Sequence, residues 1–172
     1  HMGKRYQFQH NDIESLKKQL ERSLSITKDT KGSILVITEG VFGMAGDLGS
    51  LKEICKLKSI YPFRLMVDDA HGIGTMGKNG RGTGEHFGIQ DEIDIYFGTF
   101  AKSFSSIGAF ISAPKEVISY LRYNIRSQIF AKSLPMPLVI GAIKRLEMIQ
   151  ENLSFKNRLW EITHLLQNGL KE

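Results

Sequence analysis

The chain has 172 residues, of which 41% are hydrophobic and 24% charged, the proportions of a globular domain with one core. Its 23 Lys and Arg against 18 Asp and Glu leave a net charge of +5, interspersed along the sequence. One cysteine excludes a disulfide framework and a cysteine-based zinc site, and no apolar run could span a bilayer. Collagens, coiled coils, membrane-spanning proteins and disordered tails are excluded, and we expect a cytoplasmic α/β domain.

Both ends of the sequence suggest a piece of a longer protein. His1-Met2 resembles a remnant of an expression vector, and we leave it out of the fold analysis. The last apolar helical pattern continues to Leu170 without a cap or a closing strand. We therefore expect residues 3–172 to be part of a larger domain that is truncated at both ends.

Apolar spacing predicts the first elements of the fold. Asp12 is a candidate N-cap for a helix whose apolar residues recur every three to four positions. Short apolar runs at residues 33–38, 64–68 and 93–97 predict strands of a parallel sheet, the first one buried on both faces. Ser50 begins a second helix between the first two of these strands. A short loop predicts that the next strand, residues 108–112, is antiparallel to its neighbour.

The last third of the chain is predicted to be mainly helical. Pro114 stands where the first turn of a helix begins. Residues 126–137 are apolar without a clear period, and a long helical pattern follows Pro135. Strands alternating with helices predict an α/β fold with a three-layer, mostly parallel sheet.

Seven glycines lie between Gly72 and Gly88 and match two nucleotide-binding patterns only in part. Residues 72–77 fit G-x-G-x-x-G, but the sequence that follows is a poor start for the helix that holds the pyrophosphate. A P-loop is excluded because Asn79 replaces the hydroxyl that binds magnesium. The loop is therefore either a flexible connection or a place where the backbone closely approaches a ligand or a second subunit.

Polar residues follow two of the predicted strands. Asp68 and His71 come after one strand, and Thr99 and Lys102 after the next. Taken singly, Asp68 could cap a loop and Lys102 could be a solvated lysine. Together they fit pyridoxal 5′-phosphate (PLP) chemistry, which needs a lysine for the aldehyde and a carboxylate facing the pyridine nitrogen. Ligands of α/β sheets bind at the carboxyl ends of parallel strands, so we expect these residues to share one crevice.

Three motifs in order, VDDAHGIG at 67–74, GRG at 80–82 and GTFAKS at 98–103, resemble the α-oxoamine synthases. The resemblance extends from residue 8 to residue 161 and implies the large domain of an aspartate aminotransferase-like, fold-type I transferase. It also implies PLP as cofactor, an amino acid and an acyl-CoA as substrates, loss of CO₂, and a homodimer. No nucleic acid partner is expected, and a peripheral membrane contact would suit a lipid product.

Within the family, residues 39–44, 96–97 and 126–137 are most similar to the serine palmitoyltransferase branch, which condenses serine with palmitoyl-CoA in the first step of sphingolipid synthesis. The glycine C-acetyltransferase branch is next. A further alternative is that the chain by itself is a non-catalytic fragment. The resemblance implies that the missing segments include a phosphate-binding glycine loop and a C-terminal small domain.

The resemblance also assigns roles to individual residues. Asp68 corresponds to the partner of the pyridine nitrogen, and His71 to the residue at the phenolic oxygen. Thr99 corresponds to a hydroxyl of the phosphate or of the lysine loop, and Lys102 to the Schiff-base lysine that also acts as a base. Asp69 is expected to serve structure rather than the cofactor ring.

Two positions depart from the family pattern. Many relatives carry a serine in place of Gly43 and a serine or threonine in place of Ala131, so direct cofactor contacts are not expected at either. No metal site is predicted, because the histidines lack metal-ligand spacing. Cys55 and Trp160 lie on apolar helical faces and are expected to be packed side chains.

Overall fold

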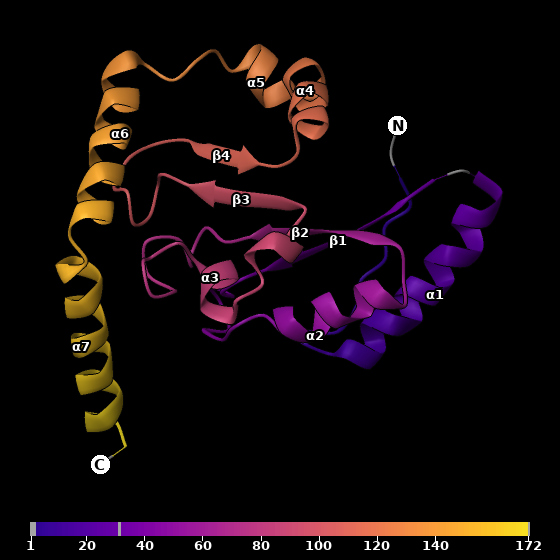
Figure 1. Ribbon diagram of the computed structural model, residues 1–172, viewed down its shortest axis with the longest axis horizontal. Coiled ribbons are helices and arrows are strands. Elements are labelled where there is room, and N and C mark those ends of the chain that lie inside the picture. The colour runs from indigo at the N-terminus through magenta and orange to yellow at the C-terminus, as the bar shows by residue number, and fades with distance from the viewer. Residues whose placement is uncertain (1–2, 31, 172) are drawn as a thin grey trace.

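The computed structural model describes residues 3–30 and 32–171, so the predicted vector remnant His1-Met2 lies outside the described residues (Figure 1). The helices are α1 (Ile13–Thr30), α2 (Leu51–Lys56), α3 (Thr83–Phe87), α4 (Lys115–Asn124), α5 (Arg126–Phe130), α6 (Met136–Glu151) and α7 (Ser154–Gly169), with short 3₁₀ turns η1 (Leu57–Ser59) and η2 (Gln90–Glu92). Within the described residues, no helix is both long and apolar enough to cross a membrane.

A four-stranded mixed sheet of order β1-β2-β3-β4 forms the centre of the fold. β1 (Ile34–Glu39), β2 (Phe63–Asp68) and β3 (Ile95–Thr99) are parallel, and β4 (Ala109–Ser112) is antiparallel to β3, as the short loop predicted. The register pairs Glu39 with Asp68 and Asp68 with Phe97, so β1 and β2 end level with one another and β3 continues two residues further, to Thr99. The predicted α/β fold with a mostly parallel sheet is confirmed.

The hydrophobic core lies between the sheet and helices α1 and α2, which cover one face of β1 and β2 (Figure 1). The predicted cap of α1 is present, because the backbone N–H of Ser15 donates to Asp12 Oδ1 over 2.8 Å. Alternate residues of β1 and β2 point to this core, as the two-residue period of a strand requires. The core residues are Leu16, Leu20, Val36, Leu51, Ile54, Cys55, Leu57, Phe63, Leu65 and Val67.

The opposite face of β1 is open, which corrects the expectation that this strand is buried on both sides. Leu35 is 47% exposed and Ile37 is 56% exposed. Both point away from Val36, which is buried under α1 and α2. Since both of these helices pack on the same face, no described helix covers the side chains of Leu35 and Ile37.

Helices α6 and α7 run end to end beside the sheet (Figure 1). The long helical pattern in the sequence is in fact two helices, because Asn152 takes an extended conformation and its side-chain oxygen accepts from the N–H of Ser154. Trp160 fixes α7 to the glycine-rich loop, since its Nε1 donates to the carbonyl of Thr75 over 2.9 Å. The segment predicted to lack a period contains the short helix α5.

Candidate active site

The structure brings the two predicted groups of polar residues together at the carboxyl end of the sheet. Asp68 is the last residue of β2, and the turn after it carries His71. Thr99 is the last residue of β3, and the loop after it carries Lys102. The two loops touch, because the hydroxyl of Ser103 donates to the carbonyl of Ile73 over 2.8 Å. The two loops that carry the predicted polar residues therefore lie side by side at this edge of the sheet.

The carboxylate of Asp68 has one oxygen available to a ligand. Asp68 is half-buried at the end of β2, and its Oδ1 accepts from the N–H of Ala70 over 3.1 Å. Its Oδ2 accepts no hydrogen bond from the described residues, while its backbone carbonyl accepts from Gly40. An unpaired carboxylate oxygen at a strand end suits a cationic N–H donor such as a protonated pyridine.

The imidazole of His71 is exposed and lies against the loop that follows β1. A Cβ on Gly43 would overlap the His71 ring, so the glycine leaves room for this ring position. The loop is held from outside by Asn11, which donates to the carbonyl of Leu48 over 3.0 Å. The glycine that departs from the family pattern therefore allows the His71 ring to occupy this position.

Thr99 shapes the loop that carries Lys102. Its hydroxyl donates to the carbonyl of Gly108 over 3.0 Å and accepts from the N–H of Ala101 over 3.1 Å. Lys102 is exposed, its carbonyl accepts from Ser105, and its Nζ has no ion pair or hydrogen bond with the described residues. Of the two expected roles of Thr99, the geometry supports the one in the lysine loop.

Asp69 points away from the crevice into the protein. It is fully buried and accepts from the N–H and hydroxyl of Thr83 over 2.7 and 2.8 Å, and from the hydroxyl of Tyr96 over 2.5 Å. Burial, then the charge and hydrogen bond of Asp69, raise the pKa of Tyr96 far above its usual range, so its hydroxyl stays protonated. The expected structural role of Asp69 agrees with this geometry.

Three glycines surround this buried carboxylate. A Cβ on Gly40, Gly72 or Gly82 would overlap a carboxylate oxygen of Asp69. Two of the seven glycines between Gly72 and Gly88, Gly72 and Gly82, are therefore explained by close packing against Asp69, and the next helix, α3, begins only at Thr83. Tyr96 and Thr83 were missed as site residues, although a tyrosine in an otherwise apolar strand is a usable sequence signal.

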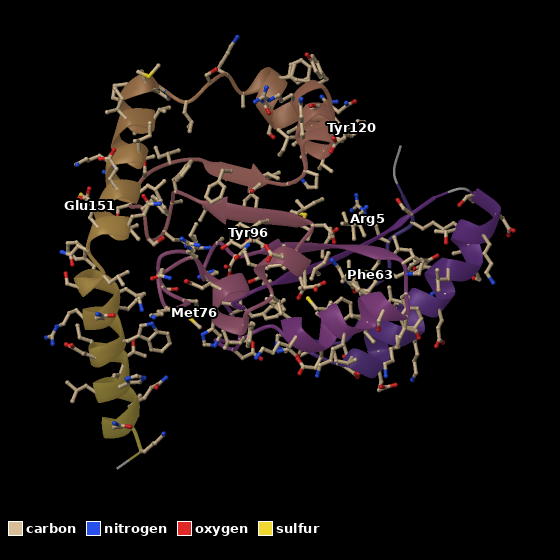
Figure 2. The ribbon with its side chains drawn as sticks, in the orientation of Figure 1. Arg5, Phe63, Met76, Tyr96, Tyr120 and Glu151 are labelled. Atoms are coloured by element: carbon tan, nitrogen blue, oxygen red, sulfur yellow. The ribbon has the colours of Figure 1, made fainter. Side chains whose placement is uncertain are left out.

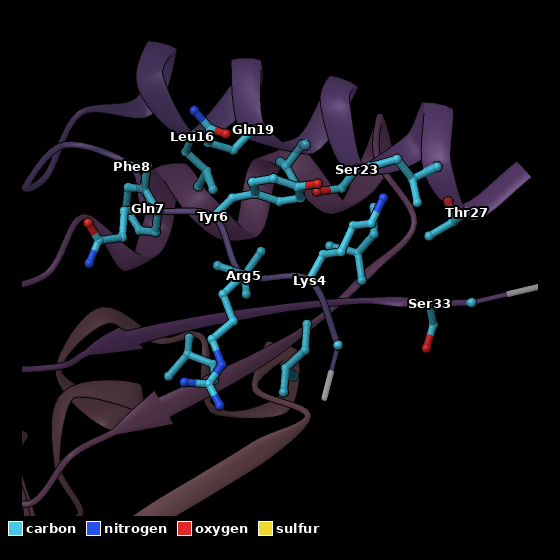
Figure 3. A pocket seen from close by; sticks show the side chains of 18 of the residues that line it. Lys4, Arg5, Tyr6, Gln7, Phe8, Leu16, Gln19, Ser23, Thr27 and Ser33 are labelled. Atoms are coloured by element: carbon cyan, nitrogen blue, oxygen red, sulfur yellow. The ribbon is translucent and has the colours of Figure 1, made fainter. Parts of the chain in front are cut away.

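Two cavities lie at different ends of the molecule. The larger, about 730 Å³, is bounded by residues 3–8, α1 and β1, and contains none of the predicted site residues (Figure 3). A smaller one of about 400 Å³ lies between the Lys102 loop, the glycine-rich loop and the junction of α6 and α7. Neither cavity is lined by the predicted site residues, so the polar residues at the strand ends, and not a cavity volume, locate the candidate site.

The donors and acceptors at the strand ends fit PLP. Lys102 offers an amine with no competing carboxylate among the described residues. Asp68 offers an unpaired oxygen, and His71 offers an exposed ring nitrogen beside the same turn. An amine for the aldehyde, an acceptor for the pyridinium and a donor for the phenolic oxygen are the groups that this cofactor requires.

Comparison with known proteins places these residues in context. The family of class I and II aminotransferases matches residues 2–172. A cysteate-C-fatty acyltransferase from Capnocytophaga ochracea is 60% identical over 172 residues, which cover 100% of this chain and 41% of the relative. A serine palmitoyltransferase from Bacteroides thetaiotaomicron is 41% identical over 165 residues, covering 96% of this chain and 41% of the relative.

Solved structures agree with this assignment. A serine palmitoyltransferase from S. paucimobilis with a bound PLP–myriocin aldimine matches 95% of this chain and 40% of that protein, with a TM-score of 0.87 and 34% identity. An 8-amino-7-oxononanoate synthase from Francisella tularensis matches 80% of this chain and 41% of that protein, with a TM-score of 0.64 and 31% identity. The chain thus spans about two fifths of the length of the relatives that it matches.

Proposed function

This chain belongs to the family of class I and II aminotransferases, among its α-oxoamine synthases, and we propose that the full-length protein is a fatty acyltransferase acting on a small amino acid. The predicted family, fold and PLP cofactor are confirmed. The observation that carries the proposal is the convergence of Asp68, His71 and Lys102 on touching loops at the carboxyl ends of adjacent strands.

The chain's own residues have distinct tasks in this proposal. Bound PLP supplies a ring that withdraws electrons from the α-carbon of the amino acid. Asp68 keeps the pyridine nitrogen protonated through its unpaired oxygen, and His71 donates to the phenolic oxygen. Lys102 holds the cofactor through Nζ and then moves the proton at the substrate α-carbon. Thr99 keeps the lysine loop in place.

For the amino acid we propose cysteate, ahead of the serine that the sequence motifs suggested. The relative named for cysteate is 60% identical, whereas the relatives named for serine are 37–41% identical. Serine with palmitoyl-CoA, leading to a sphingolipid base, is the second candidate. Glycine with acetyl-CoA remains the third, from the resemblance noted in the sequence.

The substrates can be separated with the purified full-length protein. Cysteate, serine and glycine are each supplied with palmitoyl-CoA and with acetyl-CoA, and release of CO₂ and of the CoA thiol is measured. We expect the highest kcat/KM for cysteate with palmitoyl-CoA. Preference for serine would replace the first candidate with the second, and turnover only with acetyl-CoA would contradict a fatty acyltransferase.

We also propose that the active protein is a homodimer. Residues 126–137 place apolar side chains at the surface, among them Phe130, which is 69% exposed. A second copy of the chain would remove this apolar surface from water. We further propose that the 172-residue chain alone is inactive, because Lys102 and His71 are exposed and the small domain implied by the family lies outside it.

A further inference from the structure

A buried carboxylate joins the two strand ends that carry the site. Asp69 lies between Asp68 and the turn that carries His71, and its side chain is fully buried. Its Oδ2 accepts from the hydroxyl of Tyr96, and its Oδ1 from the hydroxyl of Thr83. A buried charge is stable only when donors satisfy it, so these contacts hold Asp69 in one position.

The backbone of Asp69 is held as firmly as its side chain. Its N–H donates to the carbonyl of Phe97 on β3 over 2.9 Å. Its carbonyl accepts from the N–H groups of Gly72 and Ile73, both over 3.0 Å, which closes the turn that carries His71. The side chain and the backbone of Asp69 therefore both tie the turn that carries His71 to β3.

Tyr96 connects this turn to the lysine loop. It lies on β3 three residues before Thr99, whose hydroxyl shapes the loop of Lys102 (Figure 2). The bond from Tyr96 to Asp69 thus spans the two strands that present the carboxylate and the amine. The hydroxyl of Tyr96 also lies 3.2 Å from the carbonyl of Arg81, but its bond to Asp69 is shorter, at 2.5 Å, and joins it to the turn after β2.

We propose that Tyr96, Asp69 and Thr83 form a clamp that positions Asp68 and His71 relative to Lys102, an inference that rests on the proposed function. The three are positioning residues, because their side chains are buried while those of His71 and Lys102 are exposed. Removing the hydroxyl of Tyr96 takes one donor away from a buried carboxylate, and the backbone bond from Asp69 to Phe97 is left to hold the turn against β3 without it. The distance between the groups that face the cofactor then varies.

The test uses Tyr96→Phe in the full-length protein, with Tyr61→Phe as the matched control. Tyr61 also donates to a carboxylate, that of Glu21, but this pair is exposed and far along the chain from the site. We expect Tyr96→Phe to weaken PLP binding about tenfold and to lower kcat with little change in the KM for the amino acid. The pH at which the visible absorbance of the bound cofactor changes should also shift. Tyr61→Phe should match the wild type in all three measurements.

A second measurement does not depend on the cofactor. In the cofactor-free protein, Tyr96→Phe should speed amide hydrogen exchange at residues 69–73, while exchange in β1 stays slow. Wild-type exchange there, together with wild-type PLP affinity, would overturn the clamp. If the full-length protein binds no PLP at all, the proposed function fails, and the exchange rates still decide whether the clamp exists.

Two substitutions of Thr83, one that keeps the hydroxyl and one that removes it, test the clamp independently of Tyr96. Thr83→Ser keeps the hydroxyl that donates to Asp69 Oδ1, whereas Thr83→Val removes it at nearly constant volume. If the clamp exists, Thr83→Ser should have the PLP affinity and amide hydrogen exchange of the wild type. Thr83→Val should show the weaker PLP binding and the faster exchange at residues 69–73 that we expect of Tyr96→Phe. Identical behaviour of the two variants would contradict a role for this hydroxyl.

Discussion

The imidazole of His71 lies directly against the backbone of Gly43, in space that a side chain on residue 43 would occupy. The loop after β1 therefore controls where the proposed donor to the phenolic oxygen stands. This contact links two sequence features that had no visible connection, the histidine after β2 and the glycine that departs from the family pattern.

Gly43→Ala should displace the His71 ring and weaken PLP binding several-fold without unfolding the protein. The added methyl group meets only the end of a side chain, so the backbone can stay in place. Equilibrium dialysis with PLP and a thermal unfolding curve measure the two effects. Gly169→Ala is the control, because open space surrounds that position. Unchanged affinity in Gly43→Ala would mean that His71 does not depend on this glycine.

Gly72→Ala should destabilise the fold itself. Its Cβ would overlap the carboxylate of Asp69, which cannot move without losing its bonds to Thr83 and Tyr96. Overpacking of this kind costs about 1–3 kcal/mol of unfolding free energy. Urea unfolding of Gly72→Ala and of Gly3→Ala, where nothing lies near, provides the comparison. Equal midpoints would show that the glycine-rich turn is adaptable.

Asp94 should make the protein sensitive to acid. Burial by itself raises the pKa of the Asp94 carboxyl. Hydrogen bonds from Lys58, from the N–H of Leu65 and from Arg64 lower it by more, so the pKa is lowered overall. A pKa below the unfolded value of about 3.9 means that the stabilisation is present above that pH and disappears as the pH falls through the folded pKa.

Asp94→Asn therefore tests this pH dependence. The variant should unfold more easily than the wild type at pH 7. The difference should shrink below about pH 4, where the carboxyl of the unfolded wild type takes up a proton that the folded protein takes up only at lower pH. Unfolding free energies measured by urea titration from pH 7 to pH 3 supply the comparison. A difference that stays constant over this range would rule out the charge of Asp94 as its cause.

Phe130→Asp should convert the full-length protein to a monomer or an aggregate and reduce PLP binding at the same time. The change puts a charge on an apolar surface that we assign to the dimer interface. Light scattering measures the mass. Tyr123→Asp is the matched control, because Tyr123 is an aromatic residue on α4 that is even more exposed than Phe130 and lies outside the proposed interface segment. If Phe130→Asp remains a dimer with a full complement of PLP, residues 126–137 are not part of the interface.

Local patterns were enough to predict most of the fold. The cap at Asp12, the antiparallel strand β4 and the polar residues after β2 and β3 all follow from residue spacing, which reports on neighbours along the chain. The break at Asn152 was missed because apolar spacing continues through it, while its backbone is extended. The pattern of β1 is apolar on both faces and carries no sign that one face is open.

The sequence motifs predicted the polar residues of the candidate site, but not the buried residues that support them. Asp68, His71, Thr99 and Lys102 occupy the expected strand ends, but the bond from Tyr96 to Asp69 joins residues 27 positions apart and leaves no periodic trace. The likeness to a cysteate enzyme was also not anticipated. The motifs around the cofactor do not report on the amino acid side chain, and the rest of the relatives' length lies outside this chain.

The central claim is that Lys102 holds the cofactor. The full-length protein is incubated with PLP, reduced with borohydride and digested, and the modified peptide is located by mass spectrometry. We predict one modification per chain, on the Nζ of Lys102, and none in Lys102→Ala. Lys28→Ala, which changes an exposed lysine on α1, should still be labelled and serves as the control. A stoichiometric modification at another lysine, or one that persists in Lys102→Ala, would contradict the proposed function.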